Sequence, residues 1–545
     1  MSQLAEPPVV LATTGPRHQE SEPGPTCGER LVPGPSFARR LCDWSGSHPD
    51  LACLSAILAL GMLVRLALLY RIPSLFMPGD SQSFLIPAYD LARGLGFDPI
   101  LKRPLGYPLL LAAVIAAFGE DLRSLVFVQA MLGLVTVAAT YWLGRLAFGR
   151  VVGVLAALSV ALGGQLLIYE HYVLAESVFA MWVALGVLAI VAAVRDPSPP
   201  APLSRARERG SPGATDGRPP SIWLALAGGA AMAAASLFRP IAEVVVPLLP
   251  IYFLAAVRPA RRALVLAAVA VVGFVAVMAP AFVGDLVLRG GASSGALGEH
   301  LLWRITRSDS GYVVRADVPP DQPGSPEAAA RRYVIRKAVE RTLPQEIFMG
   351  LRREHGLSAA EADAVMRAVA LEAIGRQPVR YLTGTLRMSV ELFFGADQPL
   401  GEVAKRDGEA GYIDPQSKQR TWFEDRILHL GEPPTPAVEN EFDNAARLTT
   451  IYQPGRIIWL IALGFLIGAA LSVFTSRYRP ALLLALAIPP MLLANAALAG
   501  PEARFRYPID PLIAVLAFGG LTWLVSSVVP AIMALKAKRT TGARS

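Results

Sequence analysis

Long apolar stretches recur along most of the chain and constrain its fold more than any other feature. A stretch of about 18 or more apolar residues can cross a bilayer, and lipid forces the backbone of such a stretch into a helix. Hydrophobic residues make up 53% of the chain and charged residues 17%. The mean hydropathy of +0.44 is also outside the range of ordinary soluble domains. The sequence therefore predicts an all-α polytopic membrane protein.

We expect about ten transmembrane helices, and one shorter run decides their topology. The expected spans are 51–70, 122–147, 151–168, 173–194, 221–238, 240–257, 263–288, 452–474, 481–499 and 509–530. The run from Leu105 to Phe118 has only about fourteen residues, and we expect it to lie flat as an interfacial helix. Both termini and most arginine clusters then face the cytoplasm, as the positive-inside rule favours. If the run crosses, all of these clusters except the N-terminal one move outside.

The predicted regions follow from this pattern. They are a disordered cytoplasmic tail (1–50), a main transmembrane module (51–288) with an outer first loop (71–121), a small, mostly helical extracytoplasmic region (289–450), C-terminal transmembrane helices (451–530) and a basic cytoplasmic tail (531–545). Within the extracytoplasmic region, residues 378–394 are expected to form an amphipathic helix near the bilayer. The net charge of +8 comes from short loops between apolar runs, which indicates a membrane protein and no nucleic-acid partner.

Asp80 is the first candidate for chemistry, since it lies just outside the first span. A carboxylate there can act as a general base or bind a divalent metal; the alternative is a turn-capping Asp after Pro-Gly. The downstream pair Lys102-Arg103 suits a lipid phosphate at headgroup level. Snorkelling toward anionic lipid explains this pair equally well.

Glu170 and Glu176 are the next candidates, at the junction of the third and fourth spans. Glu176 lies inside the apolar edge of a helix, where a carboxylate is costly unless it is paired or faces a wet cavity. The alternative is an acid that complements a helix dipole. His171, beside Glu170, is a lone histidine and is more often structural.

Three arginines stand on the outer side against the positive-inside bias, in loops too short to need solvation. They are Arg239, Arg504 and Arg506. Arg65, within the first span, is near enough to an end to snorkel. The sequence contains no zinc-ligand spacing, P-loop or Rossmann-type segment, which argues against a nucleotide donor.

The order of these motifs resembles the GT-C superfamily of integral membrane glycosyltransferases. The motifs are Asp80, Arg103-Pro-Leu-Gly-Tyr-Pro-Leu-Leu-Leu-Ala, Gly144-Arg-Leu-Ala-Phe-Gly-Arg150, Leu174-Ala-Glu176-Ser and Arg506-Tyr507-Pro508. The resemblance is to bacterial relatives of dolichyl-phosphate-mannose protein mannosyltransferases and of lipid A aminoarabinose transferases, of the glycosyltransferase family 39 type. It covers residues 51–290 well and 450–530 loosely.

The resemblance implies transfer of a sugar from a polyprenyl-phosphate carrier to a lipid, glycan or protein acceptor, at the outer face of the cytoplasmic (inner) membrane. Asp80 would be the catalytic base, Glu176 or Glu170 a second acid that assists or holds a metal, and Lys102 and Arg103 would bind the carrier phosphate. We also expect substrate to be bound by Arg239, Arg504, Arg506, Tyr507 and His171. Several relatives have paired acids in the first loop, whereas Ser81 follows the acid here. A divalent metal such as Mg or Mn therefore stays an open question.

Two other functions compete with this interpretation. A polysaccharide polymerase or ligase would use a polyprenyl-pyrophosphate donor instead of a monophosphate. A lipid-linked sugar transporter or flippase would be expected to show repeated halves and broken helices at the bilayer midplane. The sequence shows no such repeat, and its charged residues gather near the outer surface.

Overall fold

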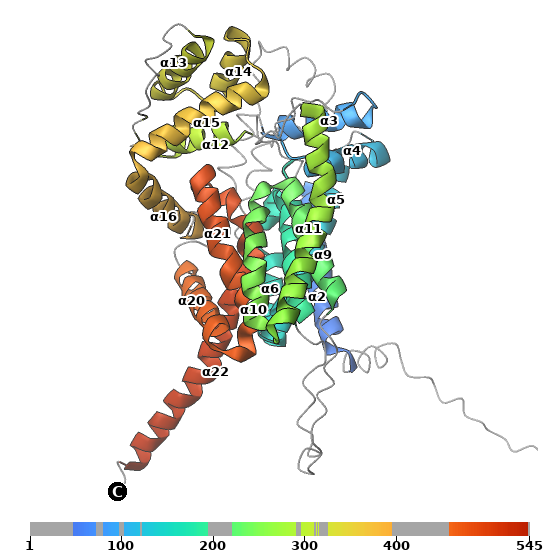
Figure 1. Ribbon diagram of the computed structural model, residues 1–545. Helices are drawn as coiled ribbons and strands as arrows, with labels where there is room; N and C mark the ends of the chain where they lie inside the picture. The colour runs from blue at the N-terminus through green and yellow to red at the C-terminus, as the bar shows by residue number, and fades with distance from the viewer. Residues whose placement is uncertain are drawn as a thin grey trace, which may run out of the picture. The chain divides into compact units, whose positions relative to one another are not determined.

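The computed structural model describes residues 47–71, 80–96, 103–119, 122–194, 221–289, 296–309, 312, 314, 325–394 and 457–542. The chain divides into a unit of residues 1–51 and a unit of residues 52–545; the second holds everything discussed below. Throughout the described ranges the regular elements are helices: α2 (Pro49–Arg71), α3 (Asp80–Ala92), α4 (Gly106–Phe118), α5 (Leu122–Ala147), α6 (Arg150–Ala161), α7 (Gly164–Tyr169), α8 (Glu176–Val194), α9 (Ile222–Phe238), η2 (Pro240–Leu248), α10 (Leu249–Ala256), α11 (Ala260–Arg289), α12 (Leu297–Trp303), η3 (Arg304–Ser308), α13 (Pro326–Val339), α14 (Pro344–Glu354), α15 (Ala359–Arg376), α16 (Pro378–Phe394), α20 (Ile458–Phe474), η5 (Ser476–Ala481), α21 (Leu482–Leu498), η6 (Ala503–Phe505), η7 (Tyr507–Ile509) and α22 (Asp510–Gly542) (Figure 1).

The protein is an all-α polytopic membrane protein, as the sequence predicts. Among the described residues, six helical segments are long and apolar enough to cross a membrane, and they lie in α2, α5, α8, α11, η5–α21 and η7–α22. Shorter apolar helices lie within the other four expected spans: α6, α9, η2–α10 and α20. The run expected to lie flat is α4, a helix of 13 residues, shorter than a bilayer requires.

Two segments differ from the expected elements. The loop expected around Asp80 contains a helix, because Asp80 is the first residue of α3. The expected span 151–168 is broken between α6 and α7, where Gly163 takes an extended conformation. Arg65 donates a hydrogen bond to the Ala161 carbonyl at the end of α6 (3.3 Å), which satisfies one carbonyl that the broken helix leaves unpaired.

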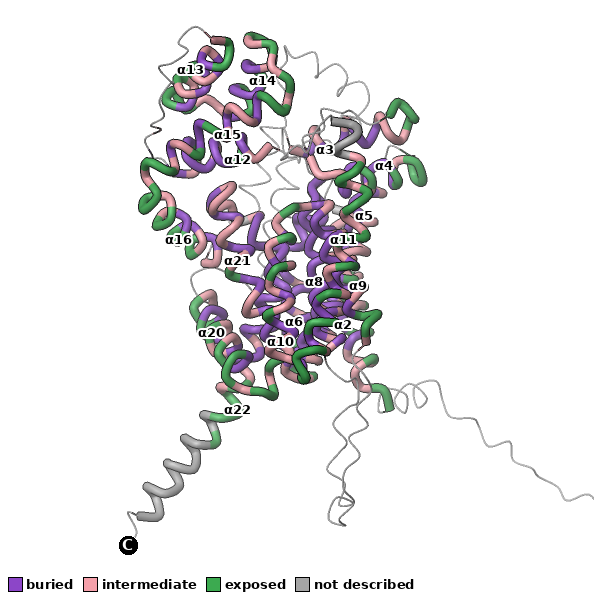
Figure 2. Tube along the Cα trace, in the orientation of Figure 1, coloured by how far each residue is buried: buried purple, intermediate pink, exposed green. Residues whose placement is uncertain are grey.

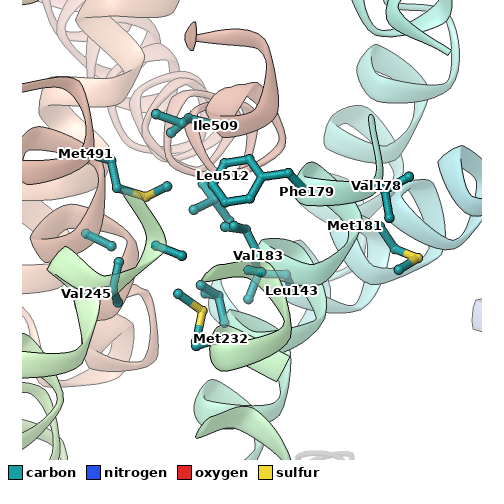
Figure 3. Close-up of a cluster of buried hydrophobic side chains, with 14 of the residues drawn as sticks. Leu143, Val178, Phe179, Met181, Val183, Met232, Val245, Met491, Ile509 and Leu512 are labelled. Carbon is teal, nitrogen blue, oxygen red and sulfur yellow. The ribbon is translucent and has the colours of Figure 1, made fainter. Parts of the chain in front are cut away.

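The main core joins helices that are far apart in the sequence (Figure 2). Figure 3 shows side chains from α5, α8, α9, η2, α21 and α22 meeting in one cluster: Leu143, Val183, Met232, Val245, Met491 and Leu512. Because lipid is as apolar as these side chains, close packing holds such helices together. The N-terminus of α8, the link from α9 to η2 and the loop before α22 are anchored by this cluster, and they carry the site described below.

A second buried cluster lies within α12–α15 and includes Leu302, Val334, Ile347, Met366 and Val369. Figure 1 shows these four helices gathered together, with α16 leading from α15 toward α21. The capping box at Ser358 and Glu361 starts α15, as its sequence pattern indicates. Residues 395–450, the last part of the expected extracytoplasmic region, lie outside the described residues.

Helix α16 is amphipathic, as expected. Four exposed apolar side chains repeat along it at helical spacing: Val379, Leu382, Leu386 and Val390. Its last residues, Phe393 and Phe394, contact Phe465 and Trp459 of α20. This exposed apolar stripe therefore adjoins the membrane helices.

Candidate functional site: an acid–arginine cluster

Asp80 lies between two arginines that come from opposite ends of the chain. Arg103 Nη2 pairs with Asp80 Oδ1, and Arg504 Nη1 pairs with Asp80 Oδ2 at 2.6 Å. Arg103 is held in turn by Ser83, whose hydroxyl accepts a hydrogen bond from Nε (2.9 Å). Glu502 Oε2 lies 2.6 Å from Arg504 Nε. Both oxygens of the Asp80 carboxylate are thus ion-paired.

Glu176 forms a second ion pair close to Asp80 and its two arginines. Glu176 Oε1 lies 3.1 Å from Arg239 Nη1, and the Glu176 side chain is only 6% exposed. The Phe505 ring links the two pairs, since the guanidinium carbons of Arg239 and Arg504 lie 4.7 and 4.9 Å from its centroid. Cation–π contacts of this kind favour a positive charge on a ring face.

Five charged residues therefore form one group, which we call the acid–arginine cluster: Asp80, Glu176, Arg103, Arg239 and Arg504. Arg239 interacts electrostatically with the other four, and Arg504 with Glu176 as well as Asp80. The sequence singled out each of these residues separately, and the structure brings them together.

The ends of helices place these side chains. Asp80 and Glu176 occupy the first turns of α3 and α8, where the helix dipole favours a negative charge. Arg239 is the single residue between α9 and η2, and the following Pro240 prevents α9 from continuing. Arg504 lies in η6, the short turn that joins α21 to η7.

The arginines strongly affect the acidity of Asp80. Burial alone would raise the pKa of Asp80, but the guanidinium groups of Arg103 and Arg504 outweigh burial and hold the pKa well below its ordinary value. Asp80 is therefore a carboxylate at neutral pH. As long as both arginines remain paired with Asp80, its carboxylate is a weak proton acceptor.

Glu170, the other predicted acid, forms a separate buried ion pair. Glu170 Oε1 lies 2.6 Å from Arg65 Nη2, and both side chains are nearly fully buried. Gly133 makes room for the pair, because a Cβ at this position would lie 1.9 Å from Glu170 Oε1. Arg65 was expected to snorkel; instead it is buried and neutralises an acid that lipid would not tolerate alone.

Gln129, which no sequence motif marks, and Tyr107 of the Arg103-Pro-Leu-Gly-Tyr107 motif connect the segment of this pair to the cluster. Gln129 donates hydrogen bonds to the carbonyls of Glu170 (2.9 Å) and Tyr172 (3.0 Å), and it accepts one from the Tyr107 hydroxyl (2.9 Å). This network holds the segment that leads into Glu176. The sequence signal for Gln129 was a polar residue within the otherwise apolar span that forms α5.

The remaining predicted residues lie elsewhere or outside the described chain. Lys102 lies outside the described residues. Arg506 pairs with Asp510 at 3.1 Å and donates to the Phe393 carbonyl. Tyr507 is buried, with its ring 5.2 Å from that of Tyr169. His171 is buried as well.

A divalent metal does not fit the acids as they stand. Within the described ranges, no group of three or more His, Cys, Asp or Glu residues could hold a metal ion. Asp80 and Glu176 both face guanidinium groups, which a cation would have to displace. The acid–arginine cluster thus holds three guanidinium groups and two carboxylates, paired with one another.

Part of the chain matches a known family. Residues 102–202, which include Arg103 and Glu176, match the family model described as dolichyl-phosphate-mannose-protein mannosyltransferase. This match confirms the predicted resemblance to GT-C glycosyltransferases. No curated protein matches the chain.

Two solved structures are also similar to this chain. The archaeal oligosaccharyltransferase AglB from Archaeoglobus fulgidus, in complex with an inhibitory peptide and a dolichol-phosphate, is 14% identical with a TM-score of 0.45 and covers 91% of this chain and 52% of its own. ArnT from Cupriavidus metallidurans, bound to undecaprenyl phosphate, is 14% identical with a TM-score of 0.37 and covers 86% of this chain and 77% of its own. This chain thus spans about half the length of the archaeal protein.

Proposed function

We propose that this chain is a membrane glycosyltransferase of the GT-C type. It moves a sugar from a polyprenyl-phosphate donor to a lipid, glycan or protein acceptor at the outer face of the cytoplasmic membrane. One observation carries the proposal: two acids and three arginines from five separate segments meet in a single cluster. The family match over residues 102–202 supports it.

The chemistry requires an anion site beside a base. The acceptor hydroxyl oxygen attacks the anomeric carbon of the sugar, the bond from that carbon to the phosphate oxygen breaks, and polyprenyl phosphate leaves with the electron pair. Fixed guanidinium groups stabilise the negative charge that grows on the phosphate. In this proposal Arg103, Arg239 and Arg504 bind the phosphate, Asp80 takes the acceptor proton and Glu176 holds Arg239 in place.

The same arginines also explain how Asp80 becomes a competent base. A donor phosphate that draws Arg103 and Arg504 away from Asp80 leaves the partly buried carboxylate with less positive charge nearby. Its pKa then rises toward the range in which a carboxylate accepts a proton more readily. Donor binding and base activation are therefore one event in this mechanism.

Product analysis tests the proposal directly. Purified protein in lipid nanodiscs is incubated with a panel of polyprenyl-monophosphate sugars and with polyprenyl-pyrophosphate sugars, and products are identified by mass spectrometry. We expect a monophosphate donor to be cleaved, with its sugar transferred to an acceptor hydroxyl or, where no acceptor is present, to water, and with free polyprenyl phosphate as the other product. Turnover of pyrophosphate donors alone would assign a polymerase or ligase instead. Movement of intact lipid-linked sugar across the bilayer, without bond cleavage, would assign a flippase.

Reporter fusions test the proposed location of the site. Fusions after residue 121, within 200–215 and within 300–440 should report outside, inside and outside, respectively. An inside signal at both the first and the last position would mean that the run from Leu105 to Phe118 crosses the bilayer, which would contradict the outer-face location.

A further inference from the structure

The C-terminal end of α21 is covered by side chains from the α12–α16 region. Arg304 Nε donates a hydrogen bond to the Ala496 carbonyl (2.9 Å), and the Tyr381 hydroxyl donates to the Ala497 carbonyl (2.8 Å). The Ser308 hydroxyl donates to the Ala499 carbonyl (2.6 Å). A helix leaves its last four carbonyls without partners in its own backbone. Three donors from another region thus cap this helix end.

The contact at Arg304 is unusual for a surface helix cap, because Arg304 is fully buried. Its guanidinium lies 5.3 Å from the centre of the Tyr381 ring, and Asp309 Oδ2 is 3.9 Å from Nη1. A cation at a helix C-terminus interacts favourably with the helix dipole. Burying this charge is costly unless hydrogen bonds and a counter-charge offset the loss of hydration.

The capped end of α21 leads directly to Arg504. Gly500 turns the chain with a positive φ of 106°, and a Cβ there would lie 2.4 Å from the Ser308 hydroxyl oxygen. The Asn495 side chain then reaches forward to the Phe505 carbonyl (3.4 Å). Only a few residues separate the three caps from the arginine that pairs with Asp80.

We propose that Arg304, Tyr381 and Ser308 are positioning residues that fix the 499–506 loop and thereby hold Arg504 toward Asp80 and the donor phosphate. The proposal rests on the proposed function for the identity of the anion. It assigns to the α12–α16 region a role in donor binding: this region controls the geometry of the arginine site through the end of α21.

Two tyrosines provide matched variants. Tyr381→Phe removes one hydroxyl from the end of α21. Tyr312→Phe removes a hydroxyl that caps the Ala373 carbonyl inside the α12–α15 cluster. The two changes are chemically identical, and both leave the ring packing in place. Arg304→Gln and the control Arg331→Gln form a second pair, since Arg331 pairs with Glu372 away from α21.

The readouts are the Kd of the full-length protein in nanodiscs for polyprenyl phosphate and hydrogen exchange of the amides in 499–506. We expect Tyr381→Phe to raise the Kd about threefold to tenfold and to speed exchange in this loop, and Arg304→Gln to do so more strongly. Arg304→Lys, which keeps the charge, should recover part of the loss. Both controls should leave the Kd and loop exchange unchanged.

A double-mutant comparison separates positioning from general loss of stability. If Tyr381 acts through Arg504, then Tyr381→Phe should add little to the effect of Arg504→Gln on the Kd. Full additivity overturns the proposal, as does an unchanged Kd in Tyr381→Phe and Arg304→Gln, even if their melting temperatures fall. Neither readout needs turnover. A protein that transfers no sugar but shows this coupling would contradict only the proposed function.

Discussion

Replacing Asp80 with asparagine separates the two roles proposed for the acid–arginine cluster, which are to bind the donor phosphate and to take the acceptor proton. Asp80→Asn keeps the shape of the side chain but removes its negative charge and most of its basicity. Without the base, turnover should fall by about two to four orders of magnitude. The same change frees Arg103 and Arg504 from the anion that now occupies them.

Freeing these arginines has a consequence for ligand binding. A hydrogen bond between charged groups contributes about 1.5–3 kcal/mol, roughly twice a neutral one. A phosphate that enters the wild-type site must displace the contacts of both arginines with Asp80, whereas in the variant it meets a neutral amide at that position and only the Glu502–Arg504 pair remains. Recovery of about 1.4 kcal/mol corresponds to a tenfold lower Kd. Asp80→Asn should therefore bind polyprenyl phosphate about tenfold more tightly while it turns over far more slowly.

The assay measures turnover and polyprenyl phosphate affinity on the same nanodisc preparation, with melting temperature as a check on folding. Asp90→Asn, on the same helix α3, is the matched control and should change neither quantity. Near-normal turnover in a well-folded Asp80→Asn protein would refute the role of Asp80 as the base. Weaker phosphate binding in that variant would refute the competition between the two anions.

Three further changes test other parts of the site. Glu176→Gln should abolish turnover and also lower the free energy of unfolding by about 2 kcal/mol, because it leaves the partly buried Arg239 without its counter-charge; unchanged stability would contradict the pairing. Arg103→Gln removes a charge that holds the pKa of Asp80 low, so the acid limb of kcat/KM should move to higher pH, and an unmoved limb would show that another group titrates there. Gly133→Ala should lower the melting temperature, since its Cβ would lie 1.9 Å from the Glu170 carboxylate; a fully stable variant would argue against the tight packing around that pair.

The apolar pattern by itself determined the class of this protein, because a bilayer leaves so few solutions for the backbone. It predicted helices close to α2, α5, α8, α11, α21 and α22, and the short length of α4. Local chemistry also marked single residues. Glu176 at an apolar helix edge and Arg239 in a tight loop are too costly in a membrane to be incidental. Each of these arguments concerns a single residue, so it could be made without knowing which other residue that side chain contacts.

Only the tertiary structure decided which charges meet. Asp80 and Arg504 are 424 positions apart, and nothing local to either residue specifies the other. The same limit explains why Glu170 was grouped with Glu176 and Arg65 with snorkelling side chains: the sequence shows that each charge needs compensation in lipid, but helix packing chooses the compensating residue. No sequence pattern marked Arg304, since its contact with the end of α21 forms only when the α12–α16 region packs against that helix. Pairing across a helical bundle depends on packing geometry, which no local pattern of residues encodes.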